Sequence, residues 1–191
     1  MFDPERDAAL MNRVKNGDRV AFEELYALYA KPIATFLHHL SWDGETVADG
    51  VQEVFLRLWR GARNWRPTGK FSTYLFQIAK NWWLNERAKR SRRVRTIRMD
   101  LPEDGEEGSP PSSEDPAAGP AALAAQRELG DRIRKAVSAL PEKLQVTFVL
   151  SEYQHLSYAE IADVLSIPVG TVKSRMSAAE KTLRRKLEKD L

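Results

Sequence analysis

Apolar residues recur every three to four positions along most of the chain, which is the period of an α-helix with one buried face. In the first half this pattern runs through Ala21–Tyr29, and Pro32 is expected to interrupt or kink it. The same period returns through Val47–Trp59 and ends at Gly61. No segment keeps the strict alternation of a half-buried strand, so the pattern predicts an all-α fold.

A long helix is predicted between Ser72, which can act as its N-cap, and about Arg93. A loop over residues 62–70 precedes it. One stripe of this helix is expected to face the core, and its residues are Leu75, Ile78, Ala79 and Trp82. The far flank of the helix carries Phe76, Lys80, Trp83 and Arg87.

The last third of the chain has the pattern of two helices joined by a tight turn. Ser157 and Glu160 form a capping-box pair, in which a hydroxyl and a carboxylate satisfy free amides at a helix start. After a turn at residues 166–168, a second helix is predicted from about Val169. Its inward positions are Val172, Met176, Ala179 and Leu183. This is the pattern of a DNA-binding helix-turn-helix, and the alternative is an αα-hairpin that only packs.

Composition restricts the class of protein. The chain has 191 residues, no cysteine and 42% hydrophobic residues, which suits one ordinary domain or two small ones. The lack of cysteine excludes a disulfide framework, a thiolate zinc site and a cysteine nucleophile. No stretch approaches the roughly 18 apolar residues of a membrane helix, and the N-terminus has no apolar signal-peptide core. We therefore expect a soluble, cytoplasmic protein.

The net charge of +3 hides a strongly uneven distribution. Residues 57–98 carry 13 basic and 1 acidic side chain, a net charge of +12, whereas residues 99–131 carry 1 basic and 9 acidic ones, a net charge of −8. The basic segment is interleaved with tryptophan, tyrosine and phenylalanine. Cations beside aromatic rings suit single-stranded nucleic acid, but a solvated basic face over an aromatic core fits the same pattern.

The acidic segment divides the chain. Residues 102–125 are rich in proline, glycine and acidic side chains and predict a disordered linker. We therefore expect two small helical domains, at residues 1–99 and 129–191, joined by a flexible acidic linker at residues 100–128.

Short sequence segments, in a fixed order, carry a resemblance. They are Ala21–Tyr29, Asp49–Trp59 and Phe71–Asn81 in the first domain, and Leu140–Glu142, Leu156–Ala162 and Gly170–Arg175 in the second. Together they resemble the extracytoplasmic-function (ECF) group of sigma-70-type bacterial sigma factors, the promoter-specificity subunits of RNA polymerase. The first domain is similar to sigma region 2 and the second to sigma region 4.

The resemblance implies three binding surfaces. The first contacts core RNA polymerase, through the coiled coil of its largest subunit, and its expected residues are Asp49, Gln52, Glu53 and Arg57. The second captures the promoter −10 element as an opened single strand, through Asn64, Trp65, Lys70, Tyr74, Lys80 and Asn81. The third reads the −35 element as duplex in the major groove, through Thr171, Lys173, Ser174 and Arg175.

The chemistry of these residues is compatible with those roles. The polymerase-binding set mixes charges of both signs, which suits a protein partner better than DNA. Trp65 and Tyr74 offer rings for base stacking, worth about 1–3 kcal/mol per base, and the Asn81 amide can hydrogen-bond a base edge. The family also implies a contact with the polymerase β flap and control by an anti-sigma factor that is often membrane-tethered. The expected location is therefore the nucleoid or, while sequestered, the membrane.

Some positions depart from the family pattern. Gly50 stands where the family has a better helix former, and glycine weakens a helix by about 1 kcal/mol. Ser177 and Ala178 replace a bulky residue and an arginine, which leaves fewer phosphate contacts. The linker follows the nascent-RNA path in the family, so an acidic strip could mimic RNA there, or it could serve only as a tether.

Two other classes of function stay open. A stand-alone helix-turn-helix regulator would explain the second domain but not the basic, aromatic first one. An enzyme would need a catalytic constellation, and the sequence offers neither a glycine-rich phosphate loop nor a Ser-His-Asp arrangement. His38, His39 and His155 are expected to be surface or packing residues. No cofactor, metal or small-molecule substrate is expected.

Overall fold

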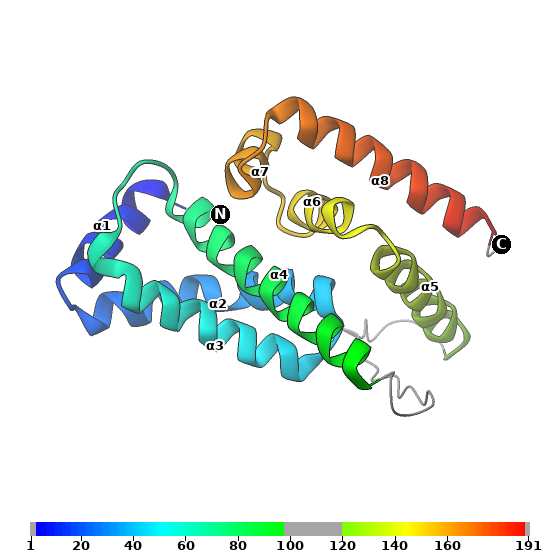
Figure 1. The fold of residues 1–191 in the computed structure, drawn as a ribbon, viewed down its shortest axis with the longest axis horizontal. Helices are drawn as coiled ribbons and strands as arrows, with labels where there is room; N and C mark the ends of the chain where they lie inside the picture. The colour runs from blue at the N-terminus through cyan, green and yellow to red at the C-terminus, as the bar shows by residue number, and fades with distance from the viewer. Residues whose placement is uncertain (1–2, 98–119, 190–191) are drawn as a thin grey trace.

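The computed structural model describes residues 3–97 and 120–189, and these fold into helices without a strand. The helices are α1 (Pro4–Lys15), α2 (Arg19–Ser41), α3 (Gly44–Gly61), the 3-10 turn η1 (Ala62–Asn64), α4 (Phe71–Ile97), α5 (Pro120–Ser138), α6 (Glu142–Glu152), α7 (Tyr158–Leu165) and α8 (Val169–Lys189). Helices α1–α4 pack as one domain and α5–α8 as a second, and the two domains touch (Figure 1). The all-α expectation is confirmed, and most of the predicted linker lies outside the described residues.

The first domain begins with a helix that the periodicity did not reveal. Asp3 caps α1 by accepting hydrogen bonds from the amides of Glu5 and Arg6, and Pro4 occupies the first turn. An Asp-Pro pair is a common helix start, so the signal was present. Helix α2 runs through Pro32 without a break, so the expected interruption does not occur.

A buried polar pair joins α1 to α2. The Asp7 side chain is 2% exposed, and the Tyr29 hydroxyl donates a hydrogen bond to its carboxylate. Burial raises the pKa of Asp7, and the hydrogen bond from Tyr29 partly offsets that rise. The ring of Tyr29 also packs edge-on against Phe71, at the start of α4. This pair therefore holds three helices of the domain together.

Helix α4 is more deeply buried than its predicted single stripe. It begins at Phe71, so Ser72 lies inside the helix and is not its cap. Phe76 and Trp83, placed on the far flank by the periodicity, are 0% and 5% exposed. Phe76 packs edge-on against Phe36 of α2, with ring centroids 5.5 Å apart. The flank is buried because α4 has neighbours on several sides, including α2, α3 and α7.

Gly50 allows α3 to pack closely against side chains of α2 and α4. A Cβ built at this position would lie 2.5 Å from Leu37 Cδ1 on α2 and 2.5 Å from Trp82 Cζ3 on α4. Glycine is therefore required here by packing, whereas the sequence suggested only a weakened helix.

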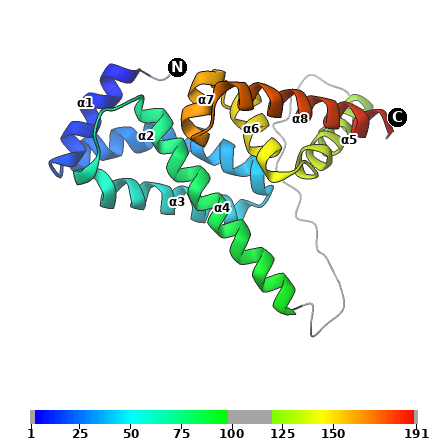
Figure 2. The same ribbon diagram turned by 45° about the horizontal axis from the view of Figure 1, so that its top comes forward.

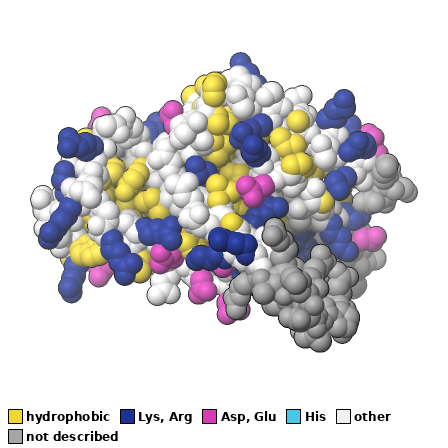
Figure 3. Space-filling view, viewed as in Figure 1, with side chains coloured by type: hydrophobic (Ala, Val, Ile, Leu, Met, Phe, Trp, Pro, Cys, Tyr) yellow, Lys and Arg dark blue, Asp and Glu magenta, His cyan; other side chains and the backbone are white. Residues whose placement is uncertain are grey.

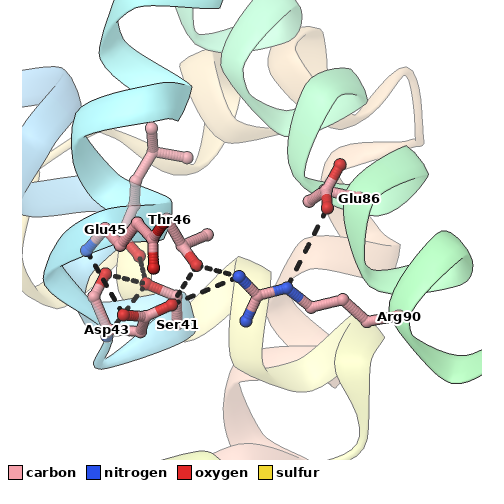
Figure 4. Close-up of polar contacts among 7 residues, drawn as sticks. Ser41, Asp43, Glu45, Thr46, Glu86 and Arg90 are labelled. Carbon is pink, nitrogen blue, oxygen red and sulfur yellow. Dashed lines mark hydrogen bonds and ion pairs between the residues drawn. The ribbon is translucent and has the colours of Figure 1, made fainter. Parts of the chain in front are cut away.

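Arg90 fastens the far half of α4 to the turn between α2 and α3 (Figure 4). Its guanidinium donates to the Asp43 carboxylate at 3.2 Å and to the Thr46 hydroxyl. Asp43 is the N-cap of α3, and the hydrogen bond from Thr46, with that from Arg90, lowers the pKa of its carboxyl. The exposed end of α4 is thus tied to the helix cap of α3.

The second domain confirms the helix-turn-helix. Ser157 and Glu160 form the predicted reciprocal capping box at the start of α7. Ser166 ends that helix in a left-handed conformation (φ 54°), and α8 follows from Val169. The four predicted inward residues of α8 are all buried. Helix α5, however, begins at Pro120, inside the predicted linker. Its alanine-rich start favours helix, and proline suits a first helical position.

The helix pairs α4–α7, α2–α6 and α2–α5 join the two domains. Helix α7 packs against α4, and α6 packs against α2 (Figure 2). At the second contact the His39 ring stacks on Tyr153, with centroids 3.6 Å apart, and the buried Gln145 amide donates to the Leu40 carbonyl at 3.4 Å. Among the helices in residues 3–97 and 120–189, none is long and apolar enough to cross a membrane.

The packing around Gly50 generates a stability prediction. Gly50→Ala should lower the free energy of unfolding, because overpacking of about 1–3 kcal/mol outweighs the gain in helix propensity of about 1 kcal/mol. Urea unfolding of the purified variant measures this. Gly44→Ala is the matched control, since a Cβ there meets nothing within 4 Å. A Gly50→Ala variant as stable as the Gly44→Ala control would contradict the packing role.

The Asp7–Tyr29 pair generates a pH-dependent prediction. Tyr29→Phe should lower the free energy of unfolding at neutral pH by about 1–3 kcal/mol, because a buried carboxylate loses a donor. The pKa of Asp7 is already raised in the folded protein, and losing the donor raises it further. In the variant, folding favours the protonated form of the Asp7 carboxyl. The difference in free energy of unfolding between the variant and the unmodified protein should therefore shrink as the pH falls through the raised pKa of Asp7. Urea unfolding at neutral and acidic pH tests this, and a deficit independent of pH would count against it.

Candidate polymerase and promoter interfaces

The four predicted polymerase-binding residues lie together. Asp49, Gln52, Glu53 and Arg57, all on α3, line one shallow hollow. Its other wall belongs to α4 and includes Glu86, Lys89 and Arg90. The Arg57 guanidinium and the Glu53 carboxylate form an ion pair at 2.8 Å. The hollow therefore presents both signs of charge in a fixed arrangement.

An apolar groove between α2 and α3 adjoins this hollow, and sequence reasoning missed it. Its aromatic lining comes from Phe22, Tyr26, Phe55 and Trp59. Phe22 packs edge-on against both Phe55 and Trp59. Gln52 and Leu56 line both the groove and the hollow. Helix α3 thus offers one continuous surface, half apolar and half charged. The periodicity marked these aromatic positions only as helical and could not show that a groove stays open between them.

The predicted −10 residues fall into three environments. Asn64 and Asn81 are exposed. Lys70, Tyr74 and Lys80 face the second domain: Lys70 pairs with Glu160 at 2.7 Å, Tyr74 lines a cleft against α7, and Lys80 donates to the Val164 carbonyl at 3.3 Å. Burial raises the pKa of the Tyr74 hydroxyl and lowers that of the Lys80 ammonium.

Trp65 is in the core. Its side chain is 5% exposed, so its ring offers no free face for base stacking in this structure. Helix α1 lies beside this segment, because it packs against η1 and its Lys15 ammonium donates to the Trp65 carbonyl at 3.3 Å. Since α1 was not identified from the sequence, Trp65 appeared to lie in an uncovered loop. In this structure Trp65 is a packing residue, and its stacking on a base of the −10 strand stays a prediction.

The predicted −35 residues occupy the first two turns of α8. Lys173 and Ser174 are exposed, and Thr171 and Arg175 are half-buried. The Ser174 hydroxyl donates to the Thr171 carbonyl at 3.0 Å. The N-terminus of a helix attracts phosphate through its free amides, and Lys173 adds a positive charge there. On the face of the molecule drawn in Figure 3, Lys and Arg side chains are spread over both domains.

His38 and His39 have packing roles, whereas His155 is exposed. His38 and His39 lie at the end of α2 beside Trp42 and Tyr153. Burial lowers the pKa of His39 to about 4, so its ring is neutral at pH 7. Within the described part of the chain, no group of three His, Cys, Asp or Glu residues could hold a metal ion.

Comparison with known proteins identifies the family. Residues 25–93 match the family model for Sigma-70 region 2, and residues 130–183 match the model for Sigma-70, region 4. The ECF RNA polymerase sigma-E factor of Escherichia coli (strain K12) is 32% identical over 184 residues, which cover 95% of this chain and 94% of that protein. This chain belongs to the ECF group of sigma factors.

Two solved structures share the fold of this sigma factor. CnrH, in complex with the cytosolic domain of CnrY, superposes with a TM-score of 0.70 at 22% identity, covering 97% of this chain and 99% of that one. The sigma factor RpoE from Bartonella quintana, in complex with the anti-sigma factor NepR, gives 0.67 at 20% identity, covering 89% and 98%.

Family membership establishes the general activity. A sigma factor binds core RNA polymerase and promoter DNA and directs transcription initiation, and the family is not one of enzymes. The match over residues 25–93 accounts for the first domain, which a stand-alone helix-turn-helix regulator leaves unexplained.

Proposed function

We propose that this sigma factor divides promoter recognition among three surfaces. The α3 surface, with Asp49, Gln52, Glu53 and Arg57, docks on core polymerase. The loop before α4 and the α4 face around Lys70, Tyr74, Lys80 and Asn81 capture the −10 element as an opened single strand. The first turns of α8 read the −35 element in the major groove.

The spatial separation of these surfaces carries the proposal. The hollow and apolar groove on α3 combine both signs of charge with aromatic rings, which suits a protein partner. The −10 residues lie in the segment with a net charge of +12, as binding to a polyanion requires. Lys173 and Ser174 stand exposed at a helix N-terminus after a tight turn, the docking geometry of a recognition helix.

Melting of the −10 element would then follow from differential binding. Unstacking a base costs a few kcal/mol, and contacts that only an unpaired base can make offset that cost. The exposed Asn81 amide is the side chain best placed for such a contact, because it lies one residue beyond Lys80 on the basic face of α4. Tyr74, half-buried two turns earlier on α4, offers a second ring for stacking besides the buried Trp65.

Control by an anti-sigma factor is part of the proposal. The Bartonella quintana relative was solved in complex with an anti-sigma factor, and the open apolar groove on α2 and α3 is a surface that such a partner could occupy in competition with polymerase. We place the protein in the cytoplasm, at the nucleoid when active and at the membrane when a tethered anti-sigma factor holds it.

The −10 role predicts the behaviour of Asn81→Ala. Run-off transcription by core polymerase on a randomised promoter library first identifies a promoter that depends on this protein. On that promoter, Asn81→Ala should reduce open-complex formation about 5- to 150-fold, which corresponds to the roughly 1–3 kcal/mol of one base-edge contact. Comigration with core polymerase on a sizing column should be unchanged. Equal loss of both activities would refute a role specific to the −10 strand.

The −35 role predicts the behaviour of Lys173→Ala. This variant should weaken protection of the −35 region in footprints of the holoenzyme. Because one phosphate contact is lost, the slope of the logarithm of the DNA-binding constant against the logarithm of the salt concentration should also fall by about 1. Lys181→Ala, further along α8 and also exposed, is the matched control. An unchanged −35 footprint, or an equal effect of Lys181→Ala, would reject the assignment of Lys173.

A further inference from the structure

A basic notch lies at the end of the first domain, where the last turn of α1 meets α3 and η1 (Figure 1). Its volume is about 510 Å³, and it includes none of the residues that the proposed function assigns to DNA. Lys15 and Gly17 line it from the side of α1, Trp59 and Arg60 from α3, and Arg63 from η1. Among the described residues, the lining has three cationic side chains and no acidic one.

The positive charge of the notch has no counter-charge beside it. Arg60 and Arg63 are exposed, and within the described part of the chain neither guanidinium forms an ion pair. The Lys15 ammonium donates to a neutral group, a backbone carbonyl, at 3.3 Å. Asp18 follows the notch in the chain, but its carboxylate is occupied by Arg13 at 2.8 Å. Gathered cations without acidic neighbours are typical of a surface that binds a polyanion.

Local structure fixes the walls of the notch. Gly17 follows α1 in the left-handed conformation (φ 87°), which favours glycine, and its amide donates to the Val14 carbonyl at 2.8 Å. Another wall is Trp59, which is half-buried and packs edge-on against Phe22, with ring centroids 5.1 Å apart. The notch therefore combines cations with an aromatic ring, the two features that bind single-stranded nucleic acid.

The notch continues the path of the proposed −10 strand. Arg63 directly precedes Asn64, and the loop of residues 65–70 runs from the notch to the start of α4 (Figure 1). This loop adds two more exposed cations, Arg66 and Lys70. In both ribbon views α8 lies towards one end of the molecule and α1 at the other, with the start of α4 between them (Figures 1 and 2). DNA that passes from the −35 element on α8 to the −10 strand on α4 therefore reaches the notch on the side of the transcription start.

We propose that the basic notch binds the backbone of the opened strand just downstream of the −10 element. Arg60 and Arg63 neutralise phosphates of that strand, and Trp59 offers its ring to an unstacked base. Contacts to phosphate carry no sequence information. The notch thus lengthens the captured strand without narrowing the choice of promoter. The inference rests on the proposed −10 role of α4, which brings the strand to the notch.

The test uses the holoenzyme and two fluorescein-labelled forked DNAs, built from the promoter that run-off transcription identifies. Both carry a duplex −35 element and a single-stranded −10 element. In the short fork the single strand ends there, and in the extended fork it continues a few nucleotides downstream. The ratio of the two affinities measures what the extension contributes to binding.

Two double variants of equal charge are compared. Arg60→Gln/Arg63→Gln removes the two unpaired guanidiniums of the notch. Arg184→Gln/Arg185→Gln makes the same change of net charge at exposed positions near the end of α8. Arg60→Lys/Arg63→Lys keeps the charge at the notch and serves as the conservative variant.

The extension should contribute about tenfold less to binding for Arg60→Gln/Arg63→Gln than for the unmodified protein or the α8 control, because two phosphate contacts are lost. For the extended fork, the slope of the logarithm of the binding constant against the logarithm of the salt concentration should fall by about 1.4, since each single-strand phosphate contributes about 0.7. Arg60→Lys/Arg63→Lys should keep most of the effect of the extension.

A second arm changes the DNA and leaves the protein unmodified. When the phosphates of the extension are replaced by uncharged methylphosphonates, the unmodified protein should lose about tenfold more affinity than Arg60→Gln/Arg63→Gln does. An extension that contributes equally in both glutamine variants would overturn the inference. Loss of comigration with core polymerase by Arg60→Gln/Arg63→Gln would also overturn it, because the notch would then bind protein.

Asn81→Ala on the short fork separates the inference from the proposed function. If Asn81→Ala weakens binding of the short fork while the extension contributes equally in both glutamine variants, the −10 role stands and the role of the notch is refuted. If Asn81→Ala leaves binding of the short fork unchanged, the −10 role of α4 fails and the inference fails with it.

Discussion

Helix α4 has a buried face that forms the core of the first domain and an outer face that is free to bind another surface. It packs against α2 and α3 to form the first domain, with Phe76 and Trp83 buried where the sequence suggested a far flank. In the proposed function it also carries basic residues that bind promoter DNA. The outer face is rich in hydrogen-bond donors, and in this structure helix α7 meets it through Glu160 and the carbonyls of its last turn.

Other contacts of the first domain hold α4 in place. Gly50 lets α3 approach α4, Arg90 ties the end of α4 to the cap of α3, and the Asp7–Tyr29 pair secures α1 and α2 behind them. These contacts fix α4 within the first domain. A rigid first domain suits a protein that, in the proposed function, holds core polymerase and an opened DNA strand on different faces at the same time.

Local sequence patterns were sufficient to predict some of these structural features. The capping box at Ser157 and the inward face of α8 follow from residues a few positions apart, so the sequence predicted both correctly. The residues proposed to bind polymerase share one helical face for the same reason. The burial of Trp65 comes from tertiary packing, and the contacts of Lys70 and Lys80 are made to a helix 80 to 90 residues away. Periodicity carries no information on such contacts, and an apolar groove such as that between α2 and α3 is equally invisible to it.

The most direct measurement is a photocrosslink between α4 and the −10 strand in the open complex. Because the chain has no cysteine, Asn85→Cys places a single photoreactive label at an exposed position one turn beyond Asn81, and Ala27→Cys places the same label at an exposed position of α2 as the control. The account predicts a crosslink from position 85 to the opened −10 strand in the holoenzyme, and none to that strand from position 27. No crosslink from position 85, or an equal one from the control, would contradict capture of the −10 strand by α4.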